Sequence, residues 1–397
     1  MRICMLTPQL PYPPEQGAAM RNYHLLRHAA RHHTVTLVAY GEATQPVPEA
    51  LSSLCDQVIL RQPLPRSYAR RLAEQIRPAP DLALRLRSRA APRQLEPPGG
   101  STTWDVVQVE GLEMMPLARQ FPAHRLLLDE HNAEYVLQQS ASRADVARGR
   151  LLPALYSLVQ TAKLIRYEGS ACAEADVVTA VSVNDAQALR HLTPSARIEV
   201  VPNGVDTARY QPDVSAEGNT AGPPTLIFAG KMDFRPNVDA TLWLAYHVLP
   251  RIWLRRPDVR FTIFGMLPPV QLQVLARDPR IDVTGYVPGF DAERRYLARA
   301  RAVVVPLQSG GGTRLKVLTA MACGKAIVST PTGCAGLDIR DGQHVLLAQS
   351  AGRFAEQVLH LLEDNDLRQR LGRAARQLAV DRYDWSAITR TMERFYT

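Results

Sequence analysis

The chain has 397 residues, of which 46% are hydrophobic, and it carries a formal net charge of +9. This length exceeds what one ordinary core uses and predicts two or more domains. The basic balance fits an anionic small ligand, an anionic membrane surface or nucleic acid, and charge alone does not choose among them. Only 6% of residues are aromatic and no basic patch is interleaved with them, which argues against nucleic acid.

The five cysteines never form a Cys-x-x-Cys pair, so the sequence offers neither a zinc site nor a disulfide framework. Cysteine usage of this kind predicts a reducing, cytoplasmic compartment. The apolar run Ile3–Leu6 is too short for the core of a signal peptide. No stretch approaches the roughly 20 apolar residues of a spanning helix. Any membrane contact is therefore expected to be peripheral, at the inner membrane face.

The first half of the chain alternates short apolar runs with helical patterns. The runs are rich in Val, Ile and Leu with little alternation, which is typical of parallel strands covered on both faces. A helical pattern separates the first two, and a long helical stretch from 133 to 174 is interrupted near Pro153. Residues 61–98 are rich in Arg and Pro and are interpreted as an insertion. The predicted strands are Arg2–Thr7, Thr34–Tyr40, Gln57–Leu60, Asp105–Val109, Arg125–Asp129, Val177–Ala180 and Glu199–Val201.

Residues 207–224 have the composition of an interdomain linker, after which the alternation starts again. The second half therefore predicts another α/β domain. Its predicted strands are Thr225–Ala229, Arg260–Phe264, Asp282–Thr284, Ala302–Pro306, Ala326–Thr330 and Val345–Leu347. Its predicted helices are Val238–Leu254, Ala292–Ala300, Leu315–Ala322, Phe354–Glu363 and Leu367–Val380.

Two loops of the first half carry candidate ligand-binding residues. Gly17 ends a Pro-rich loop just before a helix, where free N–H groups attract an anion; a simple turn that needs one glycine explains it equally well. The segment LLLDEHNAE, residues 126–134, follows a strand end with several polar groups. Its His131 can donate to a sugar hydroxyl or move a proton near neutral pH, and we favour function over a structural role there.

Two further loops follow predicted strands in the middle of the chain. Asn203 belongs to VPNGVD, a turn signal whose structural explanation is the stronger one. In FAGKMDFRPNVDA, Gly230 ends a strand, and Lys231 and Arg235 precede a helix. Cations beside a helix start suit a diphosphate, although surface lysines are common.

The most informative segment lies between residues 303 and 330. A buried strand runs into a glycine-rich loop, and a helix begins at about Arg314. Consecutive glycines at a helix start expose N–H donors to a phosphate, and Arg314 and Lys316 add positive charge. No Gly-Lys-Ser/Thr follows, so this is not a Walker loop. The loop residues that we expect to bind a ligand are Gly310, Gly311, Gly312 and Thr313.

The ordered set of these motifs resembles glycosyltransferase family 4, the retaining enzymes of the two-domain GT-B fold, and extends over nearly all of the chain. The motifs are the loop at Gly17, the histidine His131, VPNGVD, the Phe-x-Gly-x-Met opening of the second half, and Ala320-Met321-Ala322-Cys323-Gly324 after Pro306. Tyr383-Asp384-Trp385 before a last helix also matches. The branch that assembles bacterial exopolysaccharide and related glycoconjugates is the most similar.

The resemblance implies a domain plan. Two Rossmann-like α/β domains with parallel sheets would face each other across a cleft. Residues 1–206 would form the acceptor domain, 207–224 the linker and 225–380 the nucleotide-sugar-binding domain. Residues 381–397 would form a helix that returns to the first domain.

The resemblance also implies the roles of residues. Gly17 would lie against the donor, His131 would contact the donor sugar, and Lys231 would stand where the family has a diphosphate-binding arginine. The 310–313 loop would hold sugar and phosphate. Stabilisation of the departing nucleoside diphosphate by Lys231, Lys316 and helix starts would drive transfer with retention and without a metal or other cofactor. The partners would be a nucleoside-diphosphate-sugar and a glycan, lipid-linked or small-molecule acceptor.

Two departures from the family pattern leave a second function open. The family's two carboxylates fall at Gly311 and Thr319, and a second basic residue falls at Asn237. The hydroxyl of Thr319 can still contact ribose, and Arg235 or Lys316 can supply the missing charge. The alternative is a GT-B pseudo-glycosyltransferase or binding protein with an altered donor site. For the Arg-rich residues 61–93, two readings stay open: contact with anionic lipid beside a lipid-linked acceptor, or a solvated insertion.

Overall fold

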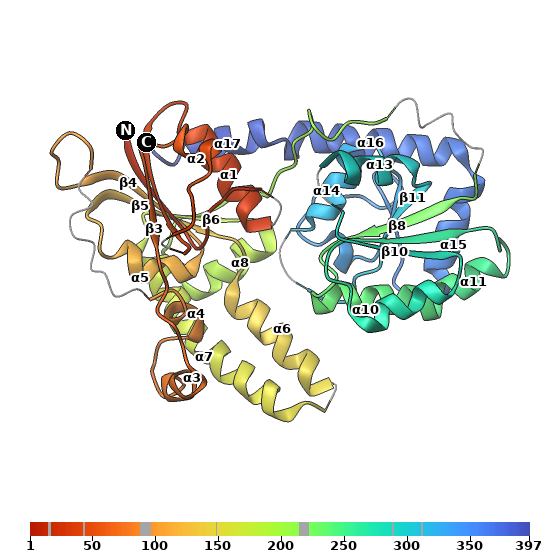
Figure 1. Cartoon of the computed structure of the whole chain (residues 1–397), viewed down its shortest axis with the longest axis horizontal. Helices are drawn as coiled ribbons and strands as arrows, with labels where there is room; N and C mark the ends of the chain where they lie inside the picture. Colours follow the sequence, from red (N-terminus) through yellow and green to blue (C-terminus); the bar gives the residue numbers. More distant parts are fainter. Residues whose placement is uncertain are drawn as a thin grey trace. The chain divides into compact units, whose positions relative to one another are not determined.

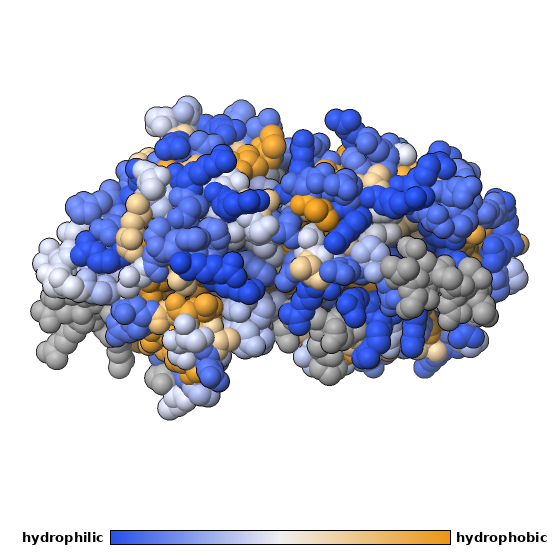
Figure 2. All heavy atoms as spheres, turned by 90° about the horizontal axis from the view of Figure 1, so that it is seen from above, coloured by the Kyte–Doolittle hydropathy of each residue, from blue (hydrophilic) through white to orange (hydrophobic). Residues whose placement is uncertain are grey.

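The computed structural model describes residues 1–14, 17–42, 44–87, 97–147, 149–213, 222–287, 290–310 and 313–397. They form two compact units, each with its own hydrophobic core. The first unit holds Met1–Pro202 together with Ile388–Thr397, and the second holds Asn203–Ala387. The prediction of an α/β protein with two Rossmann-like domains is confirmed. Figure 2 shows a largely hydrophilic face on which hydrophobic residues gather in separate patches.

The first unit is built on a seven-stranded parallel sheet in the order β3-β2-β1-β4-β5-β6-β7 (Figure 1). The order reverses direction between β1 and β4, which is the point at which sheets of this kind bind ligands. All seven predicted strands are present. Their ends differ from the predicted ones by at most one residue, except that β5 begins two residues earlier than predicted. The strands are β1 (Arg2–Thr7), β2 (Thr34–Tyr40), β3 (Gln57–Arg61), β4 (Trp104–Glu110), β5 (Ala123–Glu130), β6 (Val177–Ala180) and β7 (Ile198–Val200).

Helices pack around this sheet. Their described members are α1 (Gly17–Ala29), α2 (Glu49–Ser52), α3 (Tyr68–Glu74), α4 (Asp81–Leu84), α5 (Met115–Ala118), α6 (Glu134–Ala147), α7 (Leu151–Glu174) and α8 (Val183–Leu192). The predicted interruption near Pro153 lies earlier, between α6 and α7. Pro153 instead occupies the first turn of α7, where its missing N–H costs no intrahelical hydrogen bond. The two helices form an antiparallel hairpin that extends away from the sheet (Figure 1).

The stretch from 61 to 98, predicted to follow neither helical nor strand periodicity, contains two short helices, α3 and α4. Gln75 and Asp81 tie this segment to α7, since the Gln160 side chain donates to Gln75 Oε1 over 2.7 Å and accepts from the Asp81 N–H over 2.8 Å. Residues 88–96 of the predicted insertion lie outside the described residues.

The second unit has a six-stranded parallel sheet in the order β10-β9-β8-β11-β12-β13, which reverses direction between β8 and β11. Its strands are β8 (Thr225–Ala229), β9 (Arg260–Phe264), β10 (Ile281–Gly285), β11 (Ala302–Val305), β12 (Ile327–Ser329) and β13 (Leu346–Leu347). Its main helices are α10 (Arg235–Trp243), α11 (Leu249–Trp253), α12 (Val270–Gln273), α13 (Phe290–Arg299), α14 (Leu315–Ala322), α15 (Ala351–Glu363) and α16 (Asn365–Tyr383). The helical run predicted from Val238 begins at Arg235, because Pro236 at the second helical position is pre-set for a helix start.

The end of the chain returns to the first unit. Helix α16 continues to Tyr383, and α17 (Trp385–Glu393) follows after one residue. In the first unit, Tyr396 Oη donates to Gln108 Oε1 over 2.6 Å, and the Glu393 carboxylate lies 2.6 Å from His33 Nε2. None of the described helices is long and apolar enough to cross a bilayer.

The first part of the predicted linker, residues 207–213, packs on the second unit. Tyr210 is buried there, and the Arg376 guanidinium donates to the carbonyl oxygens of Tyr210 and Thr207. Residues 214–221 lie outside the described part of the chain.

Candidate functional site

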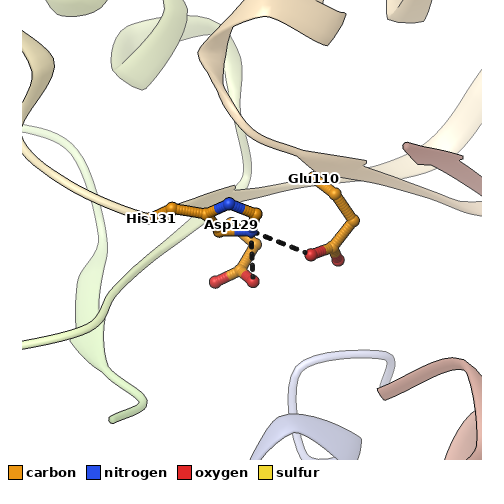
Figure 3. Close-up of side chains that lie close together, drawn as sticks. All are labelled: Glu110, Asp129 and His131. Atoms are coloured by element: carbon orange, nitrogen blue, oxygen red, sulfur yellow. Dashed lines mark hydrogen bonds and ion pairs between the residues drawn. The ribbon is translucent and has the colours of Figure 1, made fainter. Parts of the chain in front are cut away.

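A group of charged side chains lies where β4 and β5 end in the first unit. The strand register sets Glu110 opposite Asp129, and His131 follows two residues later. The ring of His131 lies between the two carboxylates, with Nε2 at 3.3 Å from Glu110 Oε2 and 3.7 Å from Asp129 Oδ2 (Figure 3). This edge is beside the β1/β4 reversal of the sheet, so the predicted His131 lies where open α/β sheets bind ligands.

Arg21 completes the group from α1, the helix that begins at Gly17. Its Nε and Nη2 donate to the two oxygens of Asp129 over 2.6 and 2.7 Å, and its Nη1 donates to the Pro202 carbonyl over 3.0 Å. Arg21 and Asp129 are both almost fully buried. A buried ion pair needs such complete pairing to offset its desolvation. The bidentate contact therefore fixes the start of α1 against the end of β5.

Neighbouring polar groups hold the two carboxylates in place. Thr179 Oγ1 in β6 donates to Asp129 Oδ1 over 2.5 Å, and Gln108 Nε2 donates to Glu110 Oε1 over 2.5 Å. Tyr396, near the end of the chain, bonds Gln108 in turn. The returning C-terminal segment thus contributes to the position of Glu110, two contacts away from His131.

The group shifts the pKa of each member. Burial by itself would lower the pKa of His131, but hydrogen bonds and charge from Asp129 and Glu110 outweigh it and raise the pKa to about 10. Burial, with the negative charge of Asp129, raises the pKa of Glu110 to about 7. Burial opposes the ionised form of Asp129, yet the Arg21 cation holds its pKa well below the ordinary range. At neutral pH the ring of His131 is therefore an imidazolium, able to donate from both nitrogens.

The donor atoms of Glu110, Asp129 and His131 lie within 4.8 Å of one another, which is close enough for a metal ion. The Arg21 cation already occupies both oxygens of Asp129, and Gln108 occupies one oxygen of Glu110. A divalent cation would have to displace these bonds and the imidazolium proton. The residues present fit an internally compensated charge cluster better than a metal centre.

A second group of predicted residues lies in the second unit, where the sheet reverses between β8 and β11. Lys316 in the first turn of α14 donates to Asn237 Oδ1 in the first turn of α10 over 2.6 Å. Its Nζ also lies 4.3 Å from the centre of the Phe228 ring. The starts of two helices, each with the positive end of its dipole, therefore converge on one cation, an arrangement suited to an anion.

Gly230 is the residue that leaves room for this contact. A Cβ at position 230 would lie 2.6 Å from Lys316 Nζ and 2.9 Å from Asn237 Nδ2. Asn237 Nδ2 also donates to the Lys231 carbonyl over 2.8 Å, which ties the loop after β8 to α10. Burial, with the nearby positive charge of Arg314, lowers the pKa of Lys316 to about 7. We call the group of three residues Gly230, Asn237 and Lys316 the lysine cradle.

The glycine-rich loop is held by Arg314. Its Nη2 donates to the Gly310 carbonyl over 2.6 Å, and its Nε donates to the Thr332 carbonyl over 3.2 Å. Arg314 is buried, so its cation contributes to the field at the cradle while it closes the loop. Gly310 has φ +123°, a conformation that favours glycine. Gly311 and Gly312 lie outside the described residues, and Thr313 and Thr319 are half-buried.

The remaining predicted residues do not join the cradle through their side chains. The ammonium of Lys231 lies 3.5 Å from Asp233, and the guanidinium of Arg235 lies 3.8 Å from Asp239; both cations are about half exposed. The turn at Asn203 is explained by packing, since a Cβ on Gly204 would lie 2.7 Å from the Trp385 ring. Gly17 is exposed at the start of α1.

Arg21 and Glu110 belong to the site although neither was predicted as a site residue. Glu110 carried a usable signal, because it directly follows the predicted strand Asp105–Val109 at its carboxyl end. Arg21 carried none, since an arginine in the first turns of a helix is ordinary, and only the tertiary contact with Asp129, 108 residues away, reveals it.

Two family models match the chain. Residues 16–209 match the model described as Glycosyltransferase Family 4, and residues 223–364 match the model described as Glycosyl transferases group 1. Phosphatidyl-myo-inositol mannosyltransferase of Mycobacterium tuberculosis is 28% identical over 203 residues, covering 49% of this chain and 53% of that protein. The alignment thus spans about half the length of that relative.

A longer alignment, 26% identical over 327 residues and 78% of both proteins, is made with a mannosyltransferase of Mycolicibacterium smegmatis. Its name is GDP-mannose-dependent alpha-(1-6)-phosphatidylinositol monomannoside mannosyltransferase. Among solved structures, sucrose-phosphate synthase from Thermosynechococcus elongatus superposes with a TM-score of 0.73 at 18% identity, covering 100% of this chain and 98% of that one. HepE of Anabaena, crystallised with UDP-glucose, gives a TM-score of 0.65 at 15% identity and covers 99% of each chain. These likenesses confirm the predicted GT-B fold, and the two sequence models, one over each half, assign the chain to the family 4 and group 1 glycosyltransferases.

Proposed function

We propose that the protein transfers a sugar from a nucleoside-diphosphate-sugar to an acceptor, with retention at the anomeric carbon. The observation that carries this proposal is the lysine cradle, in which the starts of α10 and α14 and the ammonium of Lys316 come together at the reversal of the second sheet. A diphosphate is the ligand that such a combination of helix N-termini and a cation recognises. Family membership and the nucleotide-sugar-dependent relatives support the same chemistry.

In this proposal the cradle stabilises the departing nucleoside diphosphate. Lys316 and Lys231 neutralise the charge that develops as the bond to the sugar breaks, and the loop of Gly310 and Thr313 holds phosphate and sugar. Such stabilisation needs no metal ion, because the cations come from the chain itself. In the first unit, His131 is an imidazolium that donates a hydrogen bond to a hydroxyl of the donor sugar, with Glu110, Asp129 and Arg21 as positioning residues.

The acceptor that we favour is lipid-linked, ahead of a free glycan or a small molecule. The two curated relatives described above carry names that refer to phosphatidylinositol lipids, which supports this choice. It also agrees with a place for the protein at the inner face of the membrane, in the assembly of exopolysaccharide or a related glycoconjugate.

One observation favours a second function. Gly311 and Thr319 stand where the family has carboxylates that contact the donor sugar and ribose. If Thr319 and backbone donors do not replace the two carboxylates, the protein would bind the nucleotide-sugar without transferring its sugar. A neutral hydrogen bond contributes only about 1 kcal/mol, against about 2–3 kcal/mol for one to a charged group.

The two functions are separated by a nucleotide panel followed by a turnover assay. Unfolding is measured with UDP, GDP, dTDP and ADP, and one base is expected to raise the melting temperature by mass action. The sugar nucleotides of that base are then tested for transfer and for slow donor hydrolysis. Release of nucleoside diphosphate supports transfer. Stabilisation without release from any sugar nucleotide supports the binding function, and no stabilisation by any of the four contradicts both.

A further inference from the structure

Helix α7 of the first unit is turned so that its apolar side faces solvent. Leu151, Leu155, Leu158, Ala162 and Ile165 follow one another at the spacing of a single helical face. The stripe is roughly 21 Å long at the rise of an α-helix. The large apolar side chains of this face have exposed fractions of 71% for Leu151, 81% for Leu152, 58% for Leu155, 60% for Leu158, 40% for Val159 and 40% for Ile165.

The inward face of the same helix carries polar residues, and their hydrogen bonds fix its rotation. The carboxylate of Glu168 accepts from the N–H groups of Glu134 and Tyr135 over 2.7 and 2.9 Å, which caps the start of α6. Gln160 holds the segment at Gln75 and Asp81 by hydrogen bonds of 2.7 and 2.8 Å. Turning the stripe inward would break these bonds and leave buried polar groups unpaired. The apolar face is therefore committed to the outside.

A contiguous exposed apolar face on a soluble domain marks an interaction surface. Exposed cations lie beside this one: Arg166 on α7, and Arg143 on α6, where the neighbouring Ser142 donates to the Ala154 carbonyl of α7. From Leu151 to Tyr167 the sequence contains no acidic residue. We call the stripe together with these flanking cations the α7 face.

We propose that the α7 face docks the protein on an anionic lipid bilayer, with the helix lying in the interface plane. The leucines of the stripe would enter the boundary between headgroups and acyl chains, while the arginines contact lipid phosphates. A second copy of the chain fits this surface less well, because two α7 faces packed together would bring like-charged arginines next to each other. The surface lies on the α6/α7 hairpin, so it differs from the Arg-rich stretch 61–93 considered from the sequence.

Vesicle binding without nucleotide or acceptor tests the proposal independently of the transfer reaction. The purified full chain is floated with vesicles of phosphatidylcholine alone and with vesicles containing 30% phosphatidylglycerol, about the anionic content at which a polybasic surface binds. We expect the wild-type protein to float with the anionic vesicles, at least tenfold more than with the neutral ones. The bound fraction should fall as salt is raised from 0.05 to 0.5 M, roughly the range over which the Debye length shortens from about 14 to 4 Å.

Two variants test whether vesicle binding depends on the apolar stripe or on any exposed leucine. Leu155→Gln/Leu158→Gln is expected to lower vesicle binding at least tenfold while its melting temperature stays unchanged, because both side chains are already exposed. The matched control is Leu254→Gln, a leucine of the second unit that is 86% exposed, and it is expected to bind as the wild type does. Arg166→Gln should weaken binding to anionic vesicles and leave the small neutral component unaltered.

Three results would overturn the proposal. The first is no flotation of the wild-type protein at low salt. The second is equal flotation of the wild-type protein and the double leucine variant. The third is a wild-type dimer in light scattering that the double variant abolishes without any vesicle binding, which would assign the α7 face to a second copy. Activity on a soluble acceptor in the double variant would show that a failure of docking leaves the proposed transfer function standing.

Discussion

The ammonium of Lys316 lies 2.6 Å from the amide oxygen of Asn237, and these two residues begin two different helices, α14 and α10. The resemblance to family 4 implies a basic residue at position 237, and in this chain an amide there accepts a hydrogen bond from the Lys316 cation instead. Lys316 therefore carries the charge at this point, and Asn237 orients it.

Replacing Lys316 by Ala is expected to weaken binding of the preferred nucleoside diphosphate by about 1.5–3 kcal/mol, roughly 10- to 150-fold in Kd. Asn237→Ala leaves the cation present and removes only the amide that orients it, so we expect a smaller loss of about 1 kcal/mol, roughly fivefold. Isothermal titration calorimetry measures both. Arg353→Ala, an exposed cation on α15, serves as the control for net charge. Equal small effects of the two cradle variants would contradict the role of Lys316.

The lowered pKa of Lys316 predicts proton uptake on binding. With a pKa of about 7 the side chain is mostly neutral at pH 8, and a bound diphosphate raises the pKa by favouring the ammonium. Uptake should approach one proton per nucleotide at pH 8 and vanish at pH 6. Calorimetry in buffers of different ionisation enthalpy gives the proton number. Lys316→Arg should bind without uptake, since its guanidinium stays protonated; uptake that persists in this variant would assign the proton to another group.

Substitution of Gly230 tests the space in the cradle. A Cβ there would lie 2.6 Å from Lys316 Nζ, so Gly230→Ala should push the ammonium aside and raise the Kd of the nucleotide at least tenfold, a change of about 1.4 kcal/mol. The backbone there has φ +159°, which other residues rarely adopt, so the melting temperature should fall as well, by about 2–4 °C for each kcal/mol of strain in a domain of this size. Gly352→Ala, whose Cβ meets nothing within 4 Å, is the control. Unchanged affinity in Gly230→Ala would place the ligand elsewhere.

The charge of His131 predicts a pH-dependent stability. Its pKa of about 10 in the folded state exceeds the value of about 6.5 expected for an unfolded chain. The stabilisation from the imidazolium is thus complete below about pH 6.5 and is lost as the pH rises toward 10. The melting-temperature gap between wild type and His131→Asn should be largest at pH 6 and should narrow steadily up to pH 10. Circular dichroism melts measure it, with the exposed His360→Asn as control. A gap that stays constant or widens with pH would mean that His131 is neutral in the folded protein.

Much of the architecture followed from local sequence pattern. Val-, Ile- and Leu-rich runs of four to eight residues, separated by helical periods, identified the parallel strands of both sheets, because both faces of such strands are buried. The sequence also placed His131, Gly230 and Lys316 at strand ends or helix starts, where α/β sheets bind ligands. The break in the helical stretch that was predicted near Pro153 lies just before it, between α6 and α7, because proline is tolerated in the first turn of a helix.

Tertiary structure alone decided the electrostatics and the orientation of surfaces. Arg21 meets Asp129, and Lys316 meets Asn237, only once strands and helices distant in sequence are brought to one sheet edge, and burial then shifts the pKa values. The direction that α7 faces was equally hidden. The sequence shows that α7 has an apolar side and a polar side. Which side meets the core is determined by the hydrogen bonds that Glu168 and Gln160 accept from other segments. The sequence by itself determines which residues share a strand or a helix face, because these depend on near neighbours along the chain. Charge compensation and exposure depend on partners that only folding brings together.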